Sequence, residues 1–324
     1  MFLSLNVVSV LKGVGMTKTV VVSLGGNALS SSGKVSYKNL LKSIQQTAKL
    51  LAIFVKRRYH IAIVFGSGPQ VGALLLQNEA AKKKVKPMPL DILDAEVQGE
   101  LGYLIEQALQ NELQKLKIKK PVVSLLTQVI VDQKDPMFKH PSKPVGPFLT
   151  KAKAMKLKKK GVHVKEDSGR GWRKVVPSPL PLEIDDVKVI KRLLKKNIVI
   201  AVGGGGIPVV KFRGKLKGVE AVIDKDFAAA LLASSIKADE LFVFTSVPAV
   251  YLNFKKKKQK EIKSMNVKEA KVYLKEGHFL PGSMRPKIIA ATNFLTKGGK
   301  KVTITDLSSI TKALSGKAGT VLKN

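Results

Sequence analysis

One short stretch, Thr19-Val20-Val21-Val22-Ser23-Leu24-Gly25-Gly26-Asn27, joins an apolar, β-branched run to a pair of glycines. Ile61–Phe65 and Ile198–Val202 also run into glycines, at Gly66-Ser67-Gly68-Pro69-Gln70 and Gly203-Gly204-Gly205-Gly206. Such runs are typical of buried strands, and glycine lets backbone N–H groups approach a ligand closely. A helix that starts after the loop would add the positive end of its dipole. The sequence therefore predicts three cradles for phosphate-type oxygens.

Helical patterns alternate with these predicted strands. Amphipathic spacing marks Tyr37–Lys56 and Ala95–Lys115, and a fourth glycine loop, Pro281-Gly282-Ser283-Met284, precedes a predicted helix at Pro286–Leu295. Strand–loop–helix alternation is typical of an α/β protein with a mainly parallel sheet covered by helices on both faces. Ligands of such sheets bind at the carboxyl ends of the strands, where the glycine loops are expected.

Two segments depart from this pattern. Eight of the fifteen prolines lie between Pro121 and Pro181, and prolines are unfavourable in regular core elements. We therefore expect a small protruding subdomain or lid at about residues 128–179. Residues 1–16 are an apolar leader that ends at a second methionine, and we expect this extension to lie outside the fold of residues 17–324.

Composition excludes several kinds of site. The 324-residue chain has no cysteine, which excludes disulfides, thiol nucleophiles and cysteine-based metal sites. Its four histidines are widely separated, so we expect no protein-held metal centre. No run of 18 or more apolar residues occurs, which argues against a membrane span. The lack of cysteine favours a reducing compartment, and we expect a cytoplasmic protein.

The chain is strongly basic, with 58 Lys plus Arg against 23 Asp plus Glu and a formal charge of +35. Lysine blocks at 82–84, 158–160 and 255–258 fit either solvated surfaces or binding to a polyanion. The blocks are scattered and lack interleaved aromatic residues. We therefore expect no specific nucleic-acid partner.

Three lysines differ from the blocks because each lies in a structured motif. Lys143 precedes Pro144, Lys225 lies between two aspartates at a predicted helix start, and Lys287 follows the fourth glycine loop. Asp226 could be a helix N-cap or could organise Lys225. Arg170, with Arg173, could belong to a simple turn or could bind a carboxylate or phosphate.

The sequence contains no Ser-His-Asp array, paired-carboxylate site or P-loop motif. Phosphoryl transfer needs none of these, because it depends on in-line positioning and on cations around the phosphates. If the nucleophile is already an anion, no general base is needed, and lysines with backbone N–H groups supply the stabilisation.

Taken together, these motifs resemble the carbamate kinases. The resemblance runs in order from about Thr17 to the C-terminus, and its longest parts are Glu166–Pro179 and Gly218–Asp226. Further matching segments are Leu24–Ala28, Gly66–Gly72, Met88–Asp91, Asp135–Phe138, Lys143–Phe148 and Gly282–Lys287.

The resemblance implies the amino acid kinase fold, an open αβα sandwich, in a homodimer. It implies reversible transfer between ATP and carbamate, with Mg²⁺ held mainly by the phosphates, and with the acceptor in residues 17–200 and the nucleotide in residues 201–324. Lys225 would replace the lysine that many kinases of this fold carry before the first glycine pair. The expected catalytic residues are Lys143, Lys225, Lys287 and Asp226; those around the acceptor and phosphates are Gly25, Gly26, Asn27, Gly66, Ser67, Gly68, Gly203, Gly204, Gly205 and Arg170; and those around the nucleotide are Thr245, Ser246, Val247, Tyr251, Met284 and Pro286.

The chain departs from the carbamate kinase pattern at a few positions. Ser67 stands where an asparagine is usual, Pro248 lies in the nucleotide segment, and Asp94 and Glu96 replace small or neutral residues. Two alternatives therefore stay open. One is a kinase of the same fold that acts on an amino-acid carboxylate, and the other is a non-catalytic relative that binds polyanions.

Overall fold

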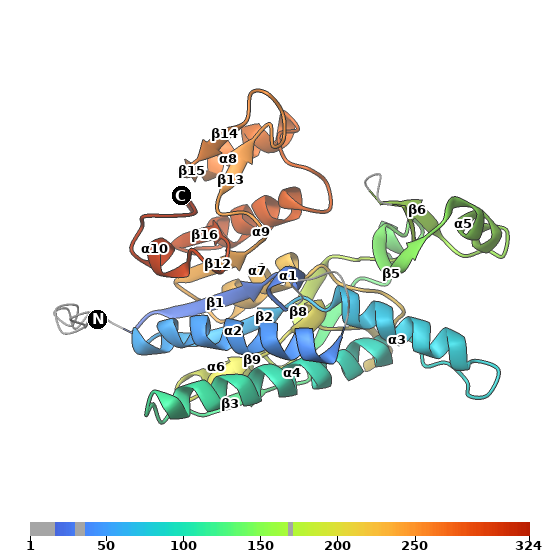
Figure 1. Ribbon diagram of the computed structural model, residues 1–324, viewed down its shortest axis with the longest axis horizontal. Helices are drawn as coiled ribbons and strands as arrows, with labels where there is room; N and C mark the ends of the chain where they lie inside the picture. The colour runs from blue at the N-terminus through green and yellow to red at the C-terminus, as the bar shows by residue number, and fades with distance from the viewer. Residues whose placement is uncertain (1–16, 30–35, 168–170) are drawn as a thin grey trace.

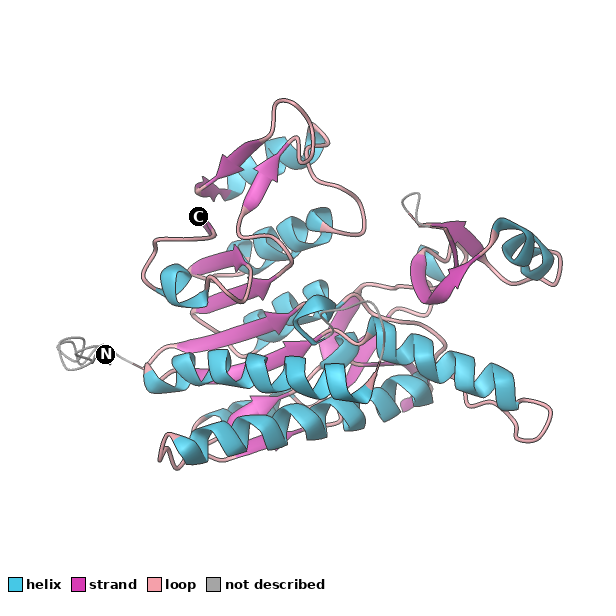
Figure 2. Cartoon of the chain, in the orientation of Figure 1, coloured by secondary structure: helices cyan, strands magenta, loops and turns pink. Residues whose placement is uncertain are grey.

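The computed structural model describes residues 17–29, 36–167 and 171–324. The expected N-terminal extension and Arg170 lie outside these described residues. A large sheet runs through the middle of the molecule, with helices on both of its faces (Figures 1 and 2). No helix in the described part of the chain has the length and apolarity needed to cross a bilayer.

The central sheet has eight strands in the described residues, in the order β15-β17-β16-β12-β1-β2-β9-β3. Neighbouring strands are parallel except at β16–β17, which is antiparallel. The strands that precede the three glycine loops, β1, β2 and β9, are adjacent, so their carboxyl ends lie side by side. The bounds are β1 Thr19–Leu24, β2 His60–Phe65, β3 Val122–Ser124, β9 Ile198–Ile200, β12 Glu240–Phe244, β15 Ser264–Asn266, β16 Lys301–Thr305 and β17 Thr320–Lys323.

Alternation along β1 sends side chains into two hydrophobic cores. Val20, Val22 and Leu24 pack with α2 (Tyr37–Lys56) and α4 (Leu90–Lys115). Val21 belongs to the opposite core, whose helices are α6 Val187–Leu194, α7 Lys225–Ser235, α8 Val267–Lys275 and α9 Met284–Thr296. The predicted α/β class, with a mainly parallel sheet between helical layers, is confirmed.

A second sheet lies beside the first, in the order β11-β10-β4-β8. Its strands are β4 Gln128–Val131, β8 Pro181–Ile184, β10 Ile207–Phe212 and β11 Lys215–Gly218. The largely apolar run Val122–Val131 does not form a single strand, because it is divided between β3 and β4 in different sheets. The chain leaves the first sheet at Leu125–Thr127, where Thr127 bonds to α4 instead of continuing the ladder.

A small unit projects from the main body, at the right of Figure 1. It contains β5 Lys143–Leu149, α5 Lys151–Lys158, β6 Val164–Glu166 and β7 Trp172–Val176, with strand order β5-β7-β6. This projecting unit is shorter than the excursion expected at residues 128–179, because β4 belongs to the second sheet. It meets α3 (Gly68–Ala81) at Gly72, where a Cβ would lie 2.8 Å from Cα of Gly146.

The remaining elements of the described residues are α1 Gly26–Leu29, α10 Ile310–Leu314, the hairpin β13 Val250–Leu252 and β14 Lys260–Ile262, and the short 3-10 turns η2 Pro136–Phe138 and η3 Gly203–Gly205. The expectation that a helix follows each glycine loop is wrong for the third one, because η3 leads into β10. The lysine blocks lie after α3, at the end of α5 and between β13 and β14, on three separate projections (Figure 1).

Candidate active site

One glycine in each of the first two glycine loops, Gly25 and Gly66, lies close to atoms of other elements. A Cβ on Gly25 would lie 2.9 Å from the carbonyl oxygen of Phe244. A Cβ on Gly66 would lie 3.1 Å from Cδ of Lys225 and 3.3 Å from the backbone nitrogen of Gly26. The two loops and Lys225 therefore share one location at the carboxyl ends of β1, β2 and β12.

Two of the three expected lysines meet on one carboxylate. Asp226, in the first turn of α7, accepts from Nζ of Lys225 at 2.5 Å and from Nζ of Lys287 at 2.9 Å. Lys225 also donates to Oγ of Ser23 at 3.0 Å. The side chains of Asp226, Lys225 and Lys287 are 5%, 12% and 13% exposed, so this cluster is largely shielded from water.

The third lysine comes from the projecting unit. Nζ of Lys143, at the start of β5, lies 2.7 Å from Oδ2 of Asp224. The other oxygen of Asp224 accepts from the backbone N–H of Asp226 at 3.0 Å and so caps α7. Lys143, Lys225 and Lys287 are thus brought together around two aspartates two residues apart.

The charges in this cluster shift one another's titration. Burial alone would raise the pKa of Asp226, but the ammonium groups of Lys225 and Lys287 outweigh burial and hold that pKa far below its usual range. Burial lowers the pKa of Lys225, with Asp226 opposing the shift and Lys287 adding to it. For Lys287 burial is outweighed by Asp226, and the pKa is raised.

The third glycine loop lies against the second. A Cβ on Gly204 would lie 2.5 Å from Oγ of Ser67. Gly205 approaches the backbone of Ile223, which precedes α7. Gly203–Gly205 is therefore placed between β2, α4 and α7, next to the lysine cluster.

The predicted nucleotide residues line a separate cavity of about 270 Å³ after β12. We call it the β12–β13 pocket. Its described lining residues are Thr245, Ser246, Val247, Tyr251, Phe254, Lys255, His278, Phe279, Leu280, Ser283 and Met284, and they do not include Pro286. Ser283 joins the pocket to the lysine cluster, because its carbonyl oxygen accepts from Nζ of Lys287 at 3.3 Å.

The remaining predicted residues are placed as follows. Gly26 and Asn27 lie in α1, and Ser67 and Gly68 begin α3. Arg173 binds Asp167 at 3.2 Å and the carbonyl oxygen of Gly146 at 3.0 Å, so it stabilises the projecting unit.

The residues that depart from the carbamate kinase pattern have different surroundings. The carbonyl oxygen of Pro248 accepts from Oγ1 of Thr305 at 3.0 Å, a bond that holds the chain after β12. Asp94 is buried in α4, where burial, with a smaller contribution from Asp91, raises its pKa well above the usual range. Glu96 is exposed.

Sequence reasoning missed two contributors to this region. Ser23 contacts Lys225. It could have been noticed in the sequence, because it is the one polar residue near the end of a buried apolar strand. Gln98 donates to the carbonyl oxygen of Gly203 at 2.9 Å. Gln98 could have been noticed in the sequence as a polar residue on the buried side of an amphipathic helix.

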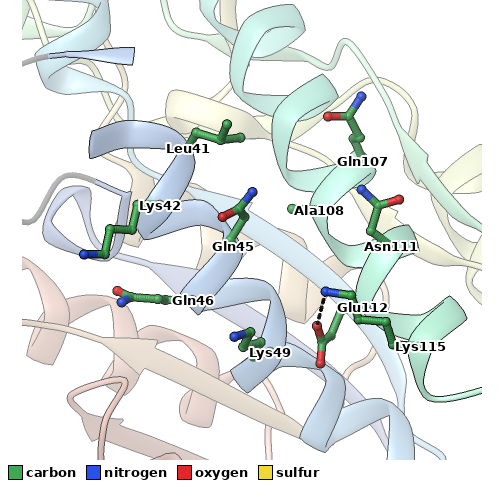
Figure 3. A pocket seen from close by; sticks show the side chains of 10 residues that line it. All are labelled: Leu41, Lys42, Gln45, Gln46, Lys49, Gln107, Ala108, Asn111, Glu112 and Lys115. Atoms are coloured by element: carbon green, nitrogen blue, oxygen red, sulfur yellow. Dashed lines mark ion pairs between the residues drawn. The ribbon is translucent and has the colours of Figure 1, made fainter. Parts of the chain in front are cut away.

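Two further features bear on ligands. No group of three or more His, Cys, Asp or Glu side chains suited to a metal ion occurs among the described residues. A hollow of about 370 Å³ lies between α2 and the C-terminal half of α4 (Figure 3), lined by side chains such as Lys49, Asn111 and Glu112. Because none of the glycine loops or clustered lysines lines it, we assign this hollow no part in the chemistry.

The fold agrees with the results of comparison with known proteins. The model of the amino acid kinase family matches residues 18–306. The chain therefore belongs to the amino acid kinase family.

Within that family the similar proteins are carbamate kinases. The carbamate kinase of Pyrococcus horikoshii is 46% identical over 310 residues, covering 94% of this chain and 99% of that protein. The Thermococcus kodakarensis carbamate kinase is 48% identical over 309 residues, covering 94% and 98%. A solved carbamate kinase from Giardia lamblia bound to AMP-PNP is 41% identical, covers 95% of this chain and 99% of that one, and superimposes with a TM-score of 0.88. The resemblance predicted from the motifs is confirmed.

Proposed function

We propose that this protein is a carbamate kinase, which catalyses ATP + carbamate ⇌ ADP + carbamoyl phosphate. The observation that carries the proposal is the meeting of Lys143, Lys225 and Lys287 around Asp224 and Asp226. Three ammonium groups face two carboxylates, which leaves a surplus positive charge beside two glycine loops. Such a site suits the meeting of two anionic reactants.

In the proposed reaction, a carbamate oxygen attacks the γ-phosphorus of ATP while the bond from that phosphorus to the β–γ bridging oxygen breaks. Carbamate is already an anion, so no proton has to be removed by a general base. Asp226 holds Lys225 and Lys287 in place. Both lysines would stabilise negative charge on the transferred group and on the leaving ADP. Preorganised donors of this kind act without reorganisation during the reaction.

The glycine loops supply backbone N–H groups to the same reactants. We assign Gly25, Gly26, Asn27, Gly66, Ser67 and Gly68 to the acceptor and phosphoryl region, and Gly203, Gly204 and Gly205 to its other wall. On this assignment residues 17–200 hold the acceptor and residues 201–324 hold the nucleotide.

The nucleotide would enter the β12–β13 pocket with Mg²⁺ held mainly by its own phosphates. Asp224 and Asp226 already bind ammonium groups. This fits an ion that is held by the phosphates and not by these two carboxylates. Mg²⁺ keeps several waters and binds nucleotide phosphates readily, and it would offset phosphate charge. A homodimer, which the resemblance implies, and a cytoplasmic location, which the lack of cysteine favours, stay predictions.

Lys143→Ala is expected to lower kcat at least about tenfold without lowering the melting temperature. Lys143 is 30% exposed, and the ion pair of a partly exposed lysine adds little to stability. Its proposed role is to place an ammonium group, from the projecting unit, beside the phosphoryl group. Steady-state rates and thermal unfolding test this, with Lys165→Ala, on exposed β6 of the same unit, as the control. An unchanged kcat would remove Lys143 from the mechanism.

Tyr251→Ala is expected to raise the KM for ADP about fivefold, which corresponds to about 1 kcal/mol of lost aromatic contact. Tyr251 lines the β12–β13 pocket, and its ring centroid lies 5.9 Å from that of Phe254. The KM for carbamoyl phosphate should stay the same, because that substrate does not enter the pocket. Tyr103→Ala, an exposed tyrosine of α4, is the control. Equal changes in both KM values would contradict the assignment.

A coupled assay for ATP formed from ADP and carbamoyl phosphate tests the proposed function directly. The main rival, a kinase for an amino-acid carboxylate, is motivated by Ser67 in place of asparagine. A panel with acetylglutamate and aspartate separates it from a carbamate kinase. Tight nucleic-acid binding at physiological salt with no ADP binding would instead favour the non-catalytic, polyanion-binding reading.

A further inference from the structure

The third glycine loop adopts a backbone conformation that its own sequence does not favour. Val202, which precedes it, has φ 56° and ψ 33° and is fully buried. A β-branched residue in the left-handed region is a strained exception, whereas glycine adopts that region freely. Gly204, Gly205 and Gly206 follow with φ of 70°, 109° and 93°. The turn therefore needs support from outside.

The side chain of Gln98 supplies part of that support. Its Nε2 donates to the carbonyl oxygens of Gly203 at 2.9 Å and of Thr127 at 3.3 Å, and its Oε1 accepts from the backbone N–H of Thr127 at 2.8 Å. Gln98 is 3% exposed. The amide is thus fixed on both sides and joins α4 to the loops after β3 and β9.

Thr127 holds the strained residue itself. Its Oγ1 accepts from the backbone N–H of Val202 at 3.1 Å and donates to the carbonyl oxygen of Leu125 at 3.1 Å. Its carbonyl oxygen also accepts from Ile207, the first residue after the glycines, at 2.9 Å. Gln98 and Thr127 therefore bind the turn before, within and after its glycines.

The turn lies at the proposed site. Gly204 rests against Ser67, and within the turn Gly205 and Gly206 donate to the carbonyl oxygens of Val202 and Gly203. The first N–H groups of a helical turn have no acceptor within it. Gly203 and Gly204 occupy these first positions of the turn, and Gly204 lies beside the second glycine loop.

We propose that Gln98 is a positioning residue which, together with Thr127, holds Val202–Gly206 in its strained form and so aims the turn's N–H groups at the phosphoryl group. This role rests on the proposed function, because it assumes that the turn binds the transferred phosphoryl. Gln98 acts through the turn and touches no reactant.

Gln98→Met tests the role by replacing the amide with an apolar side chain of similar length. It should lower kcat/KM for carbamoyl phosphate at least tenfold and change the KM for ADP less than twofold. Hydrogen exchange of the segment 202–206 should become at least tenfold faster. The matched control is Gln110→Met, because Gln110 lies on the same helix and donates to the carbonyl oxygen of Val122 at 3.4 Å, away from the turn.

Adding Val202→Gly separates positioning from general stability. Glycine adopts the left-handed conformation without strain, so Gln98→Met/Val202→Gly should regain at least half of the lost kcat/KM on a logarithmic scale. If Gln98 only stabilised the fold, the Val202→Gly substitution would remove further buried apolar atoms and would not restore the kcat/KM lost in Gln98→Met. Thr127→Val, which removes only the hydroxyl, should reproduce the rate loss and the faster exchange. This variant tests the proposal if Gln98→Met fails to fold.

The proposal is overturned if exchange at 202–206 is unchanged in Gln98→Met, if Gln110→Met has the same effect, or if Val202→Gly restores nothing. Failure of the proposed function is a different result: the unmodified protein would make no ATP from carbamoyl phosphate. The exchange measurements on Gln98→Met and Gln110→Met would still decide whether Gln98 holds the turn.

Discussion

Lys225→Ala is expected to lower kcat for ATP formation by at least about 100-fold, the loss typical of removing a preorganised donor to a developing charge. Lys225 contacts Ser23 and Asp226, and its aliphatic chain runs beside Gly66, so it lies where the first two glycine loops meet. The expected loss corresponds to about 2.7 kcal/mol of transition-state stabilisation.

The fold should survive this substitution, because Asp226 keeps its bond to Lys287 and is not left as an unpaired buried charge. Steady-state kinetics with a thermal melt of each variant make the test. Lys211→Ala is the matched control, because Lys211 forms an exposed ion pair with Glu183 on the second sheet. A Lys225→Ala protein with the rate of the unmodified one would refute the assigned role.

The strands that end in glycine loops can be predicted from the sequence, because the residues that specify each strand and its loop are neighbours in the chain. An apolar β-branched run followed by glycine specifies a strand and a close approach within nine residues, as at Thr19–Asn27. The aspartates beside Lys225 are equally local, and the sequence indicated that Asp226 either caps a helix or organises Lys225. The structure assigns them different partners, since Asp226 binds Lys225 and Asp224 binds Lys143, 81 residues away in sequence. Pattern reasoning alone does not reach such a contact, and only the resemblance indicated that Lys143 enters the site.

Other features depend on contacts that no local pattern encodes. The run Val122–Val131 is largely apolar and has the pattern of one strand, yet Gln98 binds both backbone groups of Thr127 and the chain changes sheet there. The left-handed Val202 contradicts its own conformational preference, so its turn could not be predicted from residues 198–206. Both exceptions lie beside the proposed phosphoryl site, where bonds from another element override local propensity.

Asp226→Asn is expected to be the most damaging single change to stability, lowering the free energy of unfolding by about 3–5 kcal/mol. The substitution leaves two buried ammonium groups without their shared carboxylate. Chemical denaturation at pH 7 measures the loss. Asp239→Asn, which breaks a more exposed pair with Lys300, should cost no more than about 1 kcal/mol.

The pH dependence gives a second, independent signature. Because the pKa of Asp226 is held below its unfolded value, its contribution to stability is present above that unfolded value and is lost as the pH falls towards the folded one. The asparagine variant should therefore lose less stability on acidification than the unmodified protein does.

Its activity should change at the other end of the pH range. Asp226 opposes the lowering of the Lys225 pKa by burial, so removing the carboxylate lowers that pKa further. If charged Lys225 is needed for transfer, the alkaline limb of the kcat profile moves to lower pH in Asp226→Asn. An alkaline limb that stays in place would show that Asp226 does not maintain the charge of Lys225, and the aspartate would then be only the anchor of two lysines.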